Sequence, residues 1–219
     1  MPTTPTTPTT PTRPDHVLTP ERIVAAAEET LRRFGPAKAT VVDVARTLGV
    51  SHAAVYRHFP SKTALREAVT SAWLAGVRQP LEEVRAGEGR PAAPLLREWL
   101  TVLAHRKRER ALRDPELFAT YVTLVRDSSG AVEAHVCELL ADLTGIIAAG
   151  VEQGAFLAPD PGAAARAVLN ATSPFHNPAY AEDWSRPSFE RDLRDVLDLV
   201  LRGLSRATGG DGTDGGRPC

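Results

Sequence analysis

The sequence feature that most constrains this fold is the segment 40–62, which reads TVVDVARTLGVSHAAVYRHFPSK. Its first residue, Thr40, carries the side-chain oxygen that a helix N-cap needs. Gly49 follows the last apolar residue of a predicted helix 41–48, where a glycine can adopt the left-handed conformation that ends a helix. Ser51 caps a second predicted helix that continues to His58. The segment therefore predicts two short helices that meet at a tight turn.

The apolar residues of this segment are spaced to form a small core between the two predicted helices. Val44, Leu48 and Val55 face one another in this arrangement, and the small Ala45 lets the helices cross closely. Close crossing, a tight turn and a buried anchor are typical of a helix-turn-helix motif. The alternative is an ordinary pair of core helices joined by a glycine turn.

A resemblance to a known family supports the first interpretation. The segment 20–68, and above all VYRHFPSK at 55–62, closely resembles the DNA-binding domain of the TetR family of transcriptional regulators. Beyond this segment, only the helical pattern and the length of the chain are similar to the family. The resemblance implies an all-α fold of about nine helices, with a three-helix headpiece and a C-terminal helical domain for effector binding and dimerisation.

The predicted organisation has four parts. Residues 1–18 form a Pro/Thr-rich tail, in which proline at every third position prevents regular helix and sheet pairing. Residues 19–66 form the helix-turn-helix domain, and residues 67–206 form the effector-binding and dimerisation domain. Residues 207–219 are rich in glycine and are expected to be a disordered tail.

Three local features of the predicted C-terminal domain interrupt its helices. Pro80 lacks the amide hydrogen of a helix interior, so the helix that begins at Lys62 is expected to kink or restart there. The segment 87–94 is expected to be a loop, and the prolines of SPFHNP at 173–178 are expected to end a helix at about residue 172. The basic run HRKRER at 105–110 is interpreted mainly as a solvated helix face.

Charge and composition agree with a DNA-binding protein of the cytoplasm. The net charge of the 219 residues is −1, but residues 20–66 carry eight lysines and arginines against four acidic residues. This local excess has the sign that a phosphate-facing surface requires. Only Cys137 and Cys219 are present, which favours a reducing compartment. We expect no membrane span and no signal peptide, because the apolar runs are too short.

The second helix of the motif is expected to lie in the major groove of a DNA operator. His52 can hydrogen-bond a base, the methyl groups of Ala53 and Ala54 can contact thymine methyls, and Arg57 can reach guanine or a phosphate. The family resemblance implies that Tyr56, His58 and Lys62 bind phosphates, although packing within the headpiece is the alternative for Tyr56 and His58. The predicted DNA-binding residues are Thr40, Ser51, His52, Ala53, Ala54, Tyr56, Arg57, His58 and Lys62.

The resemblance also implies a homodimer formed through the last two helices, a palindromic operator and an effector pocket inside the C-terminal domain. Aromatic residues with a few polar neighbours are typical of small-molecule sites. The candidate ligand-binding residues are Trp99, Phe118, Tyr121, Phe175, His176, Asn177 and Trp184. For each residue taken singly, a place in the hydrophobic core is the more common alternative.

Catalysis has little support in the sequence. It contains no glycine-rich phosphate loop, HExxH, nucleophile elbow or CxxC motif, so we expect no catalytic residues and no cofactor. His105, His135 and His176 lie on different predicted helices; a pair of them could bind a metal, but isolated histidines are more common. The favoured function is a repressor released from DNA by an unidentified small molecule. The alternatives are a constitutive DNA-binding dimer and a helical adaptor or enzyme with a vestigial headpiece.

Overall fold

The computed structural model describes residues 17–87, 89–126 and 130–205, so the predicted tails 1–18 and 207–219 lie almost entirely outside the described residues. Within these ranges the chain is helical, and the predicted all-α fold is confirmed. The α-helices are α1 (Pro20–Lys38), α2 (Val41–Leu48), α3 (His52–His58), α4 (Lys62–Arg85), α5 (Ala92–Arg113), α6 (Pro115–Arg126), α7 (Gly130–Glu152), α8 (Pro161–Ala171) and α9 (Phe189–Leu204). Two 3-10 helices, η1 (Ser173–Phe175) and η2 (Pro178–Ser185), lie between α8 and α9.

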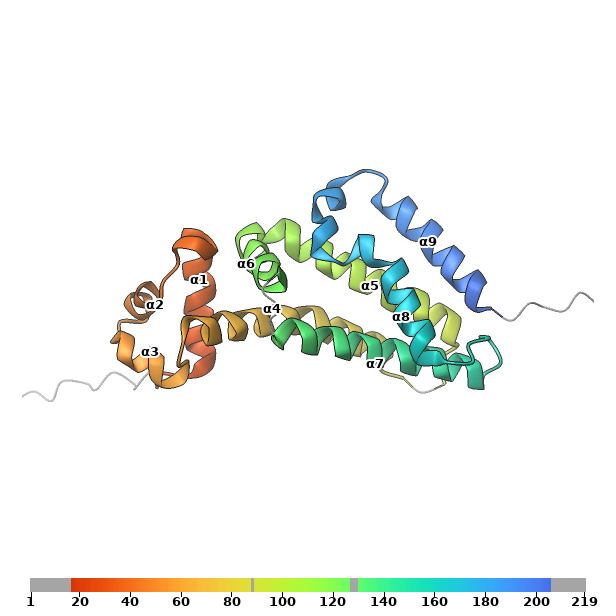
Figure 1. Cartoon of the computed structure of the whole chain (residues 1–219), viewed down its shortest axis with the longest axis horizontal. Helices are drawn as coiled ribbons and strands as arrows, with labels where there is room; N and C mark the ends of the chain where they lie inside the picture. Colours follow the sequence, from red (N-terminus) through yellow and green to blue (C-terminus); the bar gives the residue numbers. More distant parts are fainter. Residues whose placement is uncertain (1–16, 88, 127–129, 206–219) are drawn as a thin grey trace, which may run out of the picture.

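The molecule is elongated and has two parts (Figure 1). Helices α1 to α3 form a headpiece at one end, and α5 to α9 form a body at the other. Helix α4 belongs to both parts, because it begins beside α3 and then runs along α5, α6 and α7. Helix α6 packs on α1 at the junction.

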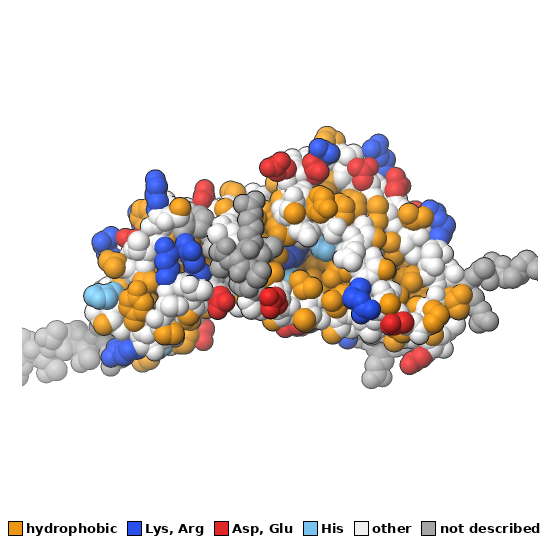
Figure 2. All heavy atoms as spheres, in the orientation of Figure 1, with side chains coloured by type: hydrophobic (Ala, Val, Ile, Leu, Met, Phe, Trp, Pro, Cys, Tyr) orange, Lys and Arg blue, Asp and Glu red, His pale blue; other side chains and the backbone are white. Residues whose placement is uncertain are grey.

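The caps predicted from the sequence build the headpiece. The Thr40 hydroxyl accepts a hydrogen bond from the Asp43 backbone N–H, and the Asp43 carboxylate accepts one from the Thr40 N–H, which makes a reciprocal capping box at the start of α2. Gly49 ends α2 with a φ of 68°. Ser51 and Ser61 cap α3 and α4 through their side-chain oxygens. Figure 2 shows several basic side chains on one face of this headpiece.

Two helices contain a residue that commonly ends a helix. The α1 helix leaves helical geometry at Gly35, where φ is 71° and ψ is 166°, and a final short turn continues to Lys38. The α4 helix neither stops nor restarts at Pro80. Val77 and Leu81 on either side of this proline are completely buried, and their packing offsets the backbone hydrogen bond that proline removes.

The SPFHNP segment interrupts the helical body as predicted. Pro174 and Pro178 occupy the first turns of η1 and η2, where a missing N–H costs little. This irregular segment crosses beside α5 and α8 before the chain enters α9. It therefore places buried residues of the segment 173–185 in the interior of the body.

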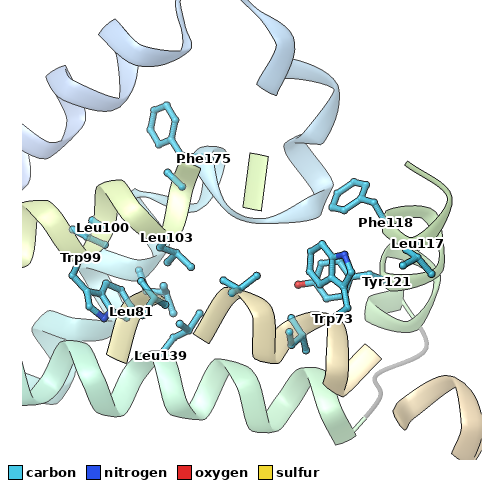
Figure 3. Close-up of a cluster of buried hydrophobic side chains, with 14 of the residues drawn as sticks. Trp73, Leu81, Trp99, Leu100, Leu103, Leu117, Phe118, Tyr121, Leu139 and Phe175 are labelled. Atoms are coloured by element: carbon cyan, nitrogen blue, oxygen red, sulfur yellow. The ribbon is translucent and has the colours of Figure 1, made fainter. Parts of the chain in front are cut away.

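The body core is rich in aromatic residues (Figure 3). At one end of the view, Trp73 of α4 lies against Tyr121 of α6, with Phe118 close by. At the other end, Trp99 of α5 lies near Leu81. Each of these side chains is at least nine-tenths buried.

The α7 helix is long and apolar enough, by length and composition alone, to cross a membrane, which differs from the sequence-based expectation. In the folded chain α7 packs on α4, α5 and α8. It also buries two polar residues, His135 and Asp142. One such helix is weak evidence for a membrane span, because the core helices of soluble proteins pass the same test.

Candidate DNA-binding surface and interior polar cluster

The α3 helix presents an exposed face of mainly polar residues at the end of the headpiece. Ser51, His52 and Ala53 are exposed at its N-terminal end, and Tyr56 and Arg57 are exposed one turn later. The rings of His52 and Tyr56 meet edge to face, with centroids 6.4 Å apart and planes at 89°. This contact aligns the two side chains on the outer face of the helix.

Ala54 does not share this exposed face, contrary to the sequence-based expectation. It is only 9% exposed, and its backbone N–H donates to the Ser51 side chain. Ala54 and Val55 are the two buried residues of α3. The Ala54 methyl group thus packs inside the headpiece and is not available to a thymine methyl.

Two further predicted residues lie at the starts of α2 and α4. Thr40 is exposed, but its hydroxyl group already forms a 2.6 Å hydrogen bond with the Asp43 carboxylate in the capping box. Lys62 is exposed on the first turn of α4. Partial burial, followed by the charge of Arg66, lowers the pKa of Lys62 below its ordinary value. A bound phosphate would relieve the repulsion between these two cations.

His58, the last residue of α3, is exposed and lies near the start of α1. Its charge is one of the smaller causes that lower the pKa of Glu21, after the backbone and Thr19 hydrogen bonds of that carboxylate. The structure therefore places α3, the α1 N-terminus and the α4 N-terminus on one side of the headpiece, with His58 and Lys62 on two of these elements.

The body interior contains a polar cluster that includes Lys107 of α5, Tyr121 of α6, His135 of α7 and His176 after η1; we call it the interior polar cluster. Lys107 is 2% exposed, and its Nζ donates a 3.0 Å hydrogen bond to the Tyr121 hydroxyl group. Burial, and secondarily the charge of Arg110, lowers the pKa of Lys107 to about 7.

Aromatic rings enclose the Lys107 ammonium group. Its Nζ lies 4.6 Å from the centroid of the Tyr121 ring and 5.4 Å from that of Trp73. The Trp73 and Tyr121 rings stack with centroids 4.6 Å apart. Phe118 lies 5.7 Å from Trp184, whose indole Nε1 donates to the Pro174 carbonyl at 2.8 Å. These contacts bring together three of the predicted ligand-binding residues, Phe118, Tyr121 and Trp184.

The two histidines of the cluster are held mainly uncharged. His135 is 4% exposed, and neither of its ring nitrogens has a hydrogen-bond partner. Burial, then the charges of Lys107, Arg78 and His176, lowers the pKa of His135 to about 2. His176 Nε2 lies 3.2 Å from the Leu169 carbonyl oxygen, and burial followed by the charge of Lys107 lowers its pKa to about 4.

The other predicted ligand-binding residues are more scattered. Phe175 is buried against Phe189 of α9, with centroids 5.5 Å apart. Trp99 is completely buried in another part of the core, and its Nε1 has no hydrogen-bond partner. Asn177 is exposed and caps η2 through a hydrogen bond from the Ala179 N–H. Asn177 therefore faces away from the interior.

Sequence reasoning missed Lys107, which was assigned to a solvated run. Its spacing from Leu96, Leu100 and Leu103 continues the inward stripe of α5, and all four residues are buried. The helical period therefore carried a signal that the surrounding arginines masked. Within the described ranges, no group of three or more histidine, cysteine, aspartate and glutamate side chains is placed to hold a metal ion.

Comparisons with known proteins identify the two parts separately. Residues 23–69 match the family described as bacterial regulatory proteins, tetR family. Residues 92–197 match the tetracyclin repressor-like, C-terminal domain. No curated protein matches the sequence in a direct search.

Solved structures have the same architecture. The TetR family transcriptional regulator PfmR from Thermus thermophilus is 28% identical, with a TM-score of 0.56; the match covers 84% of this chain and 100% of that chain. SmeT, the repressor of the Stenotrophomonas maltophilia multidrug efflux pump SmeDEF, is 20% identical, with a TM-score of 0.64 and coverage of 93% and 98%. A Rhodococcus protein of unknown function is 21% identical, with a TM-score of 0.67 and coverage of 89% and 100%.

The sequence matches extend over most of the headpiece and the body, and the structural matches extend over both. The caps of α2 and α3 and the exposed face of α3 are those of a helix-turn-helix motif. The chain therefore belongs to the TetR family and has the fold of a DNA-binding transcriptional regulator.

Proposed function

We propose that this protein is a repressor that binds a palindromic operator as a homodimer and is released by a small molecule. The observation that carries the proposal is the exposed face of α3, which offers His52 and Arg57 to base edges while Tyr56, His58 and Lys62 flank it. Side chains on such a helix can read the major groove, and cations beside it can bind the backbone. Thr40 and Ser51 complete the proposed DNA-binding set, from which Ala54 is removed.

A homodimer supplies the two reading helices that a palindrome requires. The α9 helix buries Phe189, Leu193 and Leu197 on one side, whereas Leu199 is 65% exposed on another. An apolar residue left exposed on a helix that already covers the body supports a second copy as its partner. The two reading helices then lie about 34 to 36 Å apart, or a multiple of this distance, to match successive major grooves.

The interior polar cluster supports the ligand-responsive part of the proposal. A buried lysine that donates only to a neutral hydroxyl group, and a buried histidine whose ring nitrogens have no hydrogen-bond partner, are costly in a domain that serves only as a scaffold. Phe118, Tyr121, His176 and Trp184 remain proposed ligand-binding residues, to which Lys107, His135 and Trp73 are added. Phe175 and Trp99 remain weaker candidates because they lie outside this cluster, and Asn177 is exposed.

The proposed domain division places the boundary near residue 66, within α4. Residues 19–66 would contact DNA, residues 67–206 would bind the effector and the second copy, and the protein would act in the cytoplasm. Repression is proposed by likeness to SmeT, which is the repressor of a multidrug efflux pump.

The experiment that tests this function is selection of bound fragments from genomic DNA by the full-length protein. A gel shift on the enriched fragment should then give one complex, whose mass corresponds to two chains and one duplex. Recovery of palindromic fragments upstream of genes supports the proposal. Binding to random DNA with the same affinity, or a complex that contains a single chain, would contradict it.

A further inference from the structure

We propose that the effector is a small organic anion with a flat apolar body, and that its acidic group binds Lys107 in the interior polar cluster. This inference rests on the proposed ligand response of the body and adds the chemical class of the ligand. It follows from the charges, the unpaired polar groups and the aromatic surfaces that surround Lys107.

The first argument is the missing counter-charge. Lys107 is 2% exposed, and among the described residues its only hydrogen-bond acceptor is the neutral hydroxyl group of Tyr121. None of the ion pairs among the described residues includes Lys107, and Asp142, the buried carboxylate of α7, is bound by Arg78 and Arg85. A buried cation without a carboxylate is unfavourable. A ligand that brings a negative charge removes this penalty and strengthens its own binding.

The second argument is the positive charge close to Lys107. The charge of Arg110 lies close enough to lower the pKa of Lys107 further. A cationic ligand would meet repulsion from the protonated lysine and from Arg110. The charge of Arg78 is balanced by its ion pairs with Asp142, Glu138 and Glu82, and His135 is uncharged. Because the pKa of Lys107 is about 7, this amine is readily protonated near neutral pH, and a bound anion would raise the pKa again.

The third argument is an unpaired polar side chain beside the lysine. His135 is buried, and both of its ring nitrogens lack a hydrogen-bond partner. It also lines a groove of about 530 Å³ between α4 and α7, together with Ser71 and Ala134. In Figure 2, histidine and basic side chains lie recessed in a hollow of the body, with hydrophobic side chains around it. A ligand in the groove can reach His135, and Lys107 lies close enough to His135 for its charge to lower the pKa of that histidine.

The fourth argument concerns the shape of the ligand. Trp73 and Tyr121 stack at 4.6 Å, and Phe118 lies about 6 Å from both rings. Figure 3 shows these three side chains gathered at one end of the body core. Flat aromatic surfaces beside a cation match a planar apolar body that carries one carboxylate or phenolate. A metal-binding ligand or a sugar would find few of the polar partners that it needs here.

The test compares matched pairs of probes that differ only in charge. The full-length protein is titrated with 2-naphthoate and 2-naphthamide, and with octanoate and octanamide. Quenching of tryptophan fluorescence reports binding in the body, which contains Trp73, Trp99 and Trp184, and the melting temperature is measured in parallel. We expect at least one carboxylate to bind at least tenfold more tightly than its amide and to raise the melting temperature.

The substitution Lys107→Met keeps the length and apolar stem of the side chain but removes its charge. We expect this variant to lose the preference for the carboxylate, with the affinity for the carboxylate falling at least tenfold. Arg106→Met is the matched control, because Arg106 is the neighbouring cation on α5 and pairs with Glu109 near the surface. The control should retain the carboxylate preference.

The anion proposal is overturned if the amides bind as tightly as the carboxylates, if no carboxylate binds, or if Lys107→Met keeps the preference. Operator release is measured separately by gel shift with the same probes. Release by an amide would leave the proposed regulatory function intact and remove the anionic ligand class. Tight binding of a carboxylate without any effect on DNA would support the ligand class and contradict the proposed release.

Discussion

Arg32 of α1 donates a hydrogen bond of 2.8 Å from its Nε to the Oδ2 atom of Asp114, which lies between α5 and α6. The two residues are 82 positions apart in the sequence, so this ion pair joins the headpiece directly to the body. Arg32 also pairs with Glu28 and Glu29 on its own helix. Asp114 thereby belongs to a small network of ion pairs, centred on Arg32, at the contact between α1 and α6.

Replacing Arg32 by glutamine should loosen this junction. The side chain of Arg32 is 39% exposed, so we expect the free energy of unfolding to fall by no more than about 1 kcal/mol, as for other solvent-accessible ion pairs. Thermal denaturation measures the change. Arg33→Gln is the matched control, because no ion pair of Arg33 is recorded among the described residues, and it should have a smaller effect. Equal destabilisation by both variants would contradict the role of the Asp114 contact.

Lys62→Ala tests the proposed phosphate contact at the start of α4. We expect weaker binding to operator and random DNA alike, and a plot of log affinity against log salt whose slope is smaller by about 1. Gel shifts across a series of salt concentrations measure both quantities. Arg186→Ala, which removes an exposed arginine between η2 and α9 in the body, should leave the slope unchanged. An unchanged slope for Lys62→Ala would place the lysine outside the phosphate contacts.

His52→Ala tests base recognition by α3. We expect a loss of about 1–3 kcal/mol on the preferred operator and a smaller loss on random DNA, because a base contact adds affinity only at its own sequence. Competition gel shifts, or a repeated fragment selection, measure the altered preference. The expectation fails if operator and random DNA lose affinity equally, since His52 would then act on the backbone.

The buried Lys107 predicts that the free energy of unfolding increases in mild alkali. Its pKa is lowered to about 7 in the folded chain, whereas an unfolded lysine has a pKa of about 10.4. Between these values the unfolded chain binds more protons, so this residue makes the free energy of unfolding rise with pH from about 7 to about 10. The rise is at most about 1.4 kcal/mol per pH unit. Urea denaturation across this range should show the rise in the wild type and a flatter profile in Lys107→Met.

The buried residues His135 and His176 predict that the free energy of unfolding falls in mild acid. Burial lowers the pKa of His135 to about 2 and that of His176 to about 4, below the unfolded value of about 6.5. The unfolded chain therefore binds more protons below pH 6.5, and stability falls as the pH is lowered towards 4. His135→Leu removes one titrating group, so its urea denaturation midpoint should depend less on pH between 6.5 and 4. An unchanged dependence would mean that His135 is accessible to protons in the folded chain.

Local chemistry made the headpiece predictable from the sequence. The caps Thr40, Ser51 and Ser61 and the turn at Gly49 act within four residues, so their effects can be read without knowing the rest of the fold. The burial of Ala54 depends on which side of α3 meets the other helices. The sequence gives that direction only approximately, which explains the error at this residue.

The body was harder to predict because its interior depends on contacts between distant helices. Lys107 is buried by α4 and α6, which meet it through Trp73 and Tyr121, although its sequence neighbours are charged. Pro80 is accommodated because α4 is packed along much of its length, which a local rule for proline does not include. The aromatic residues of the sequence suggested candidates for a ligand-binding site. Their type alone did not show that Phe118 and Tyr121 lie together whereas Trp99 lies elsewhere in the core.

The unbroken α4 helix has a mechanical consequence. Its 24 residues make a rod about 36 Å long, with Trp73, a proposed ligand-binding residue, near its middle and Lys62, a proposed DNA-binding residue, at its first position. A tilt of about 5° applied at the body end displaces the other end by about 3 Å over this length. Such a shift is comparable to a hydrogen-bond length, so in the proposed dimer a ligand that moved only a few side chains in the body would take both copies out of register with the DNA.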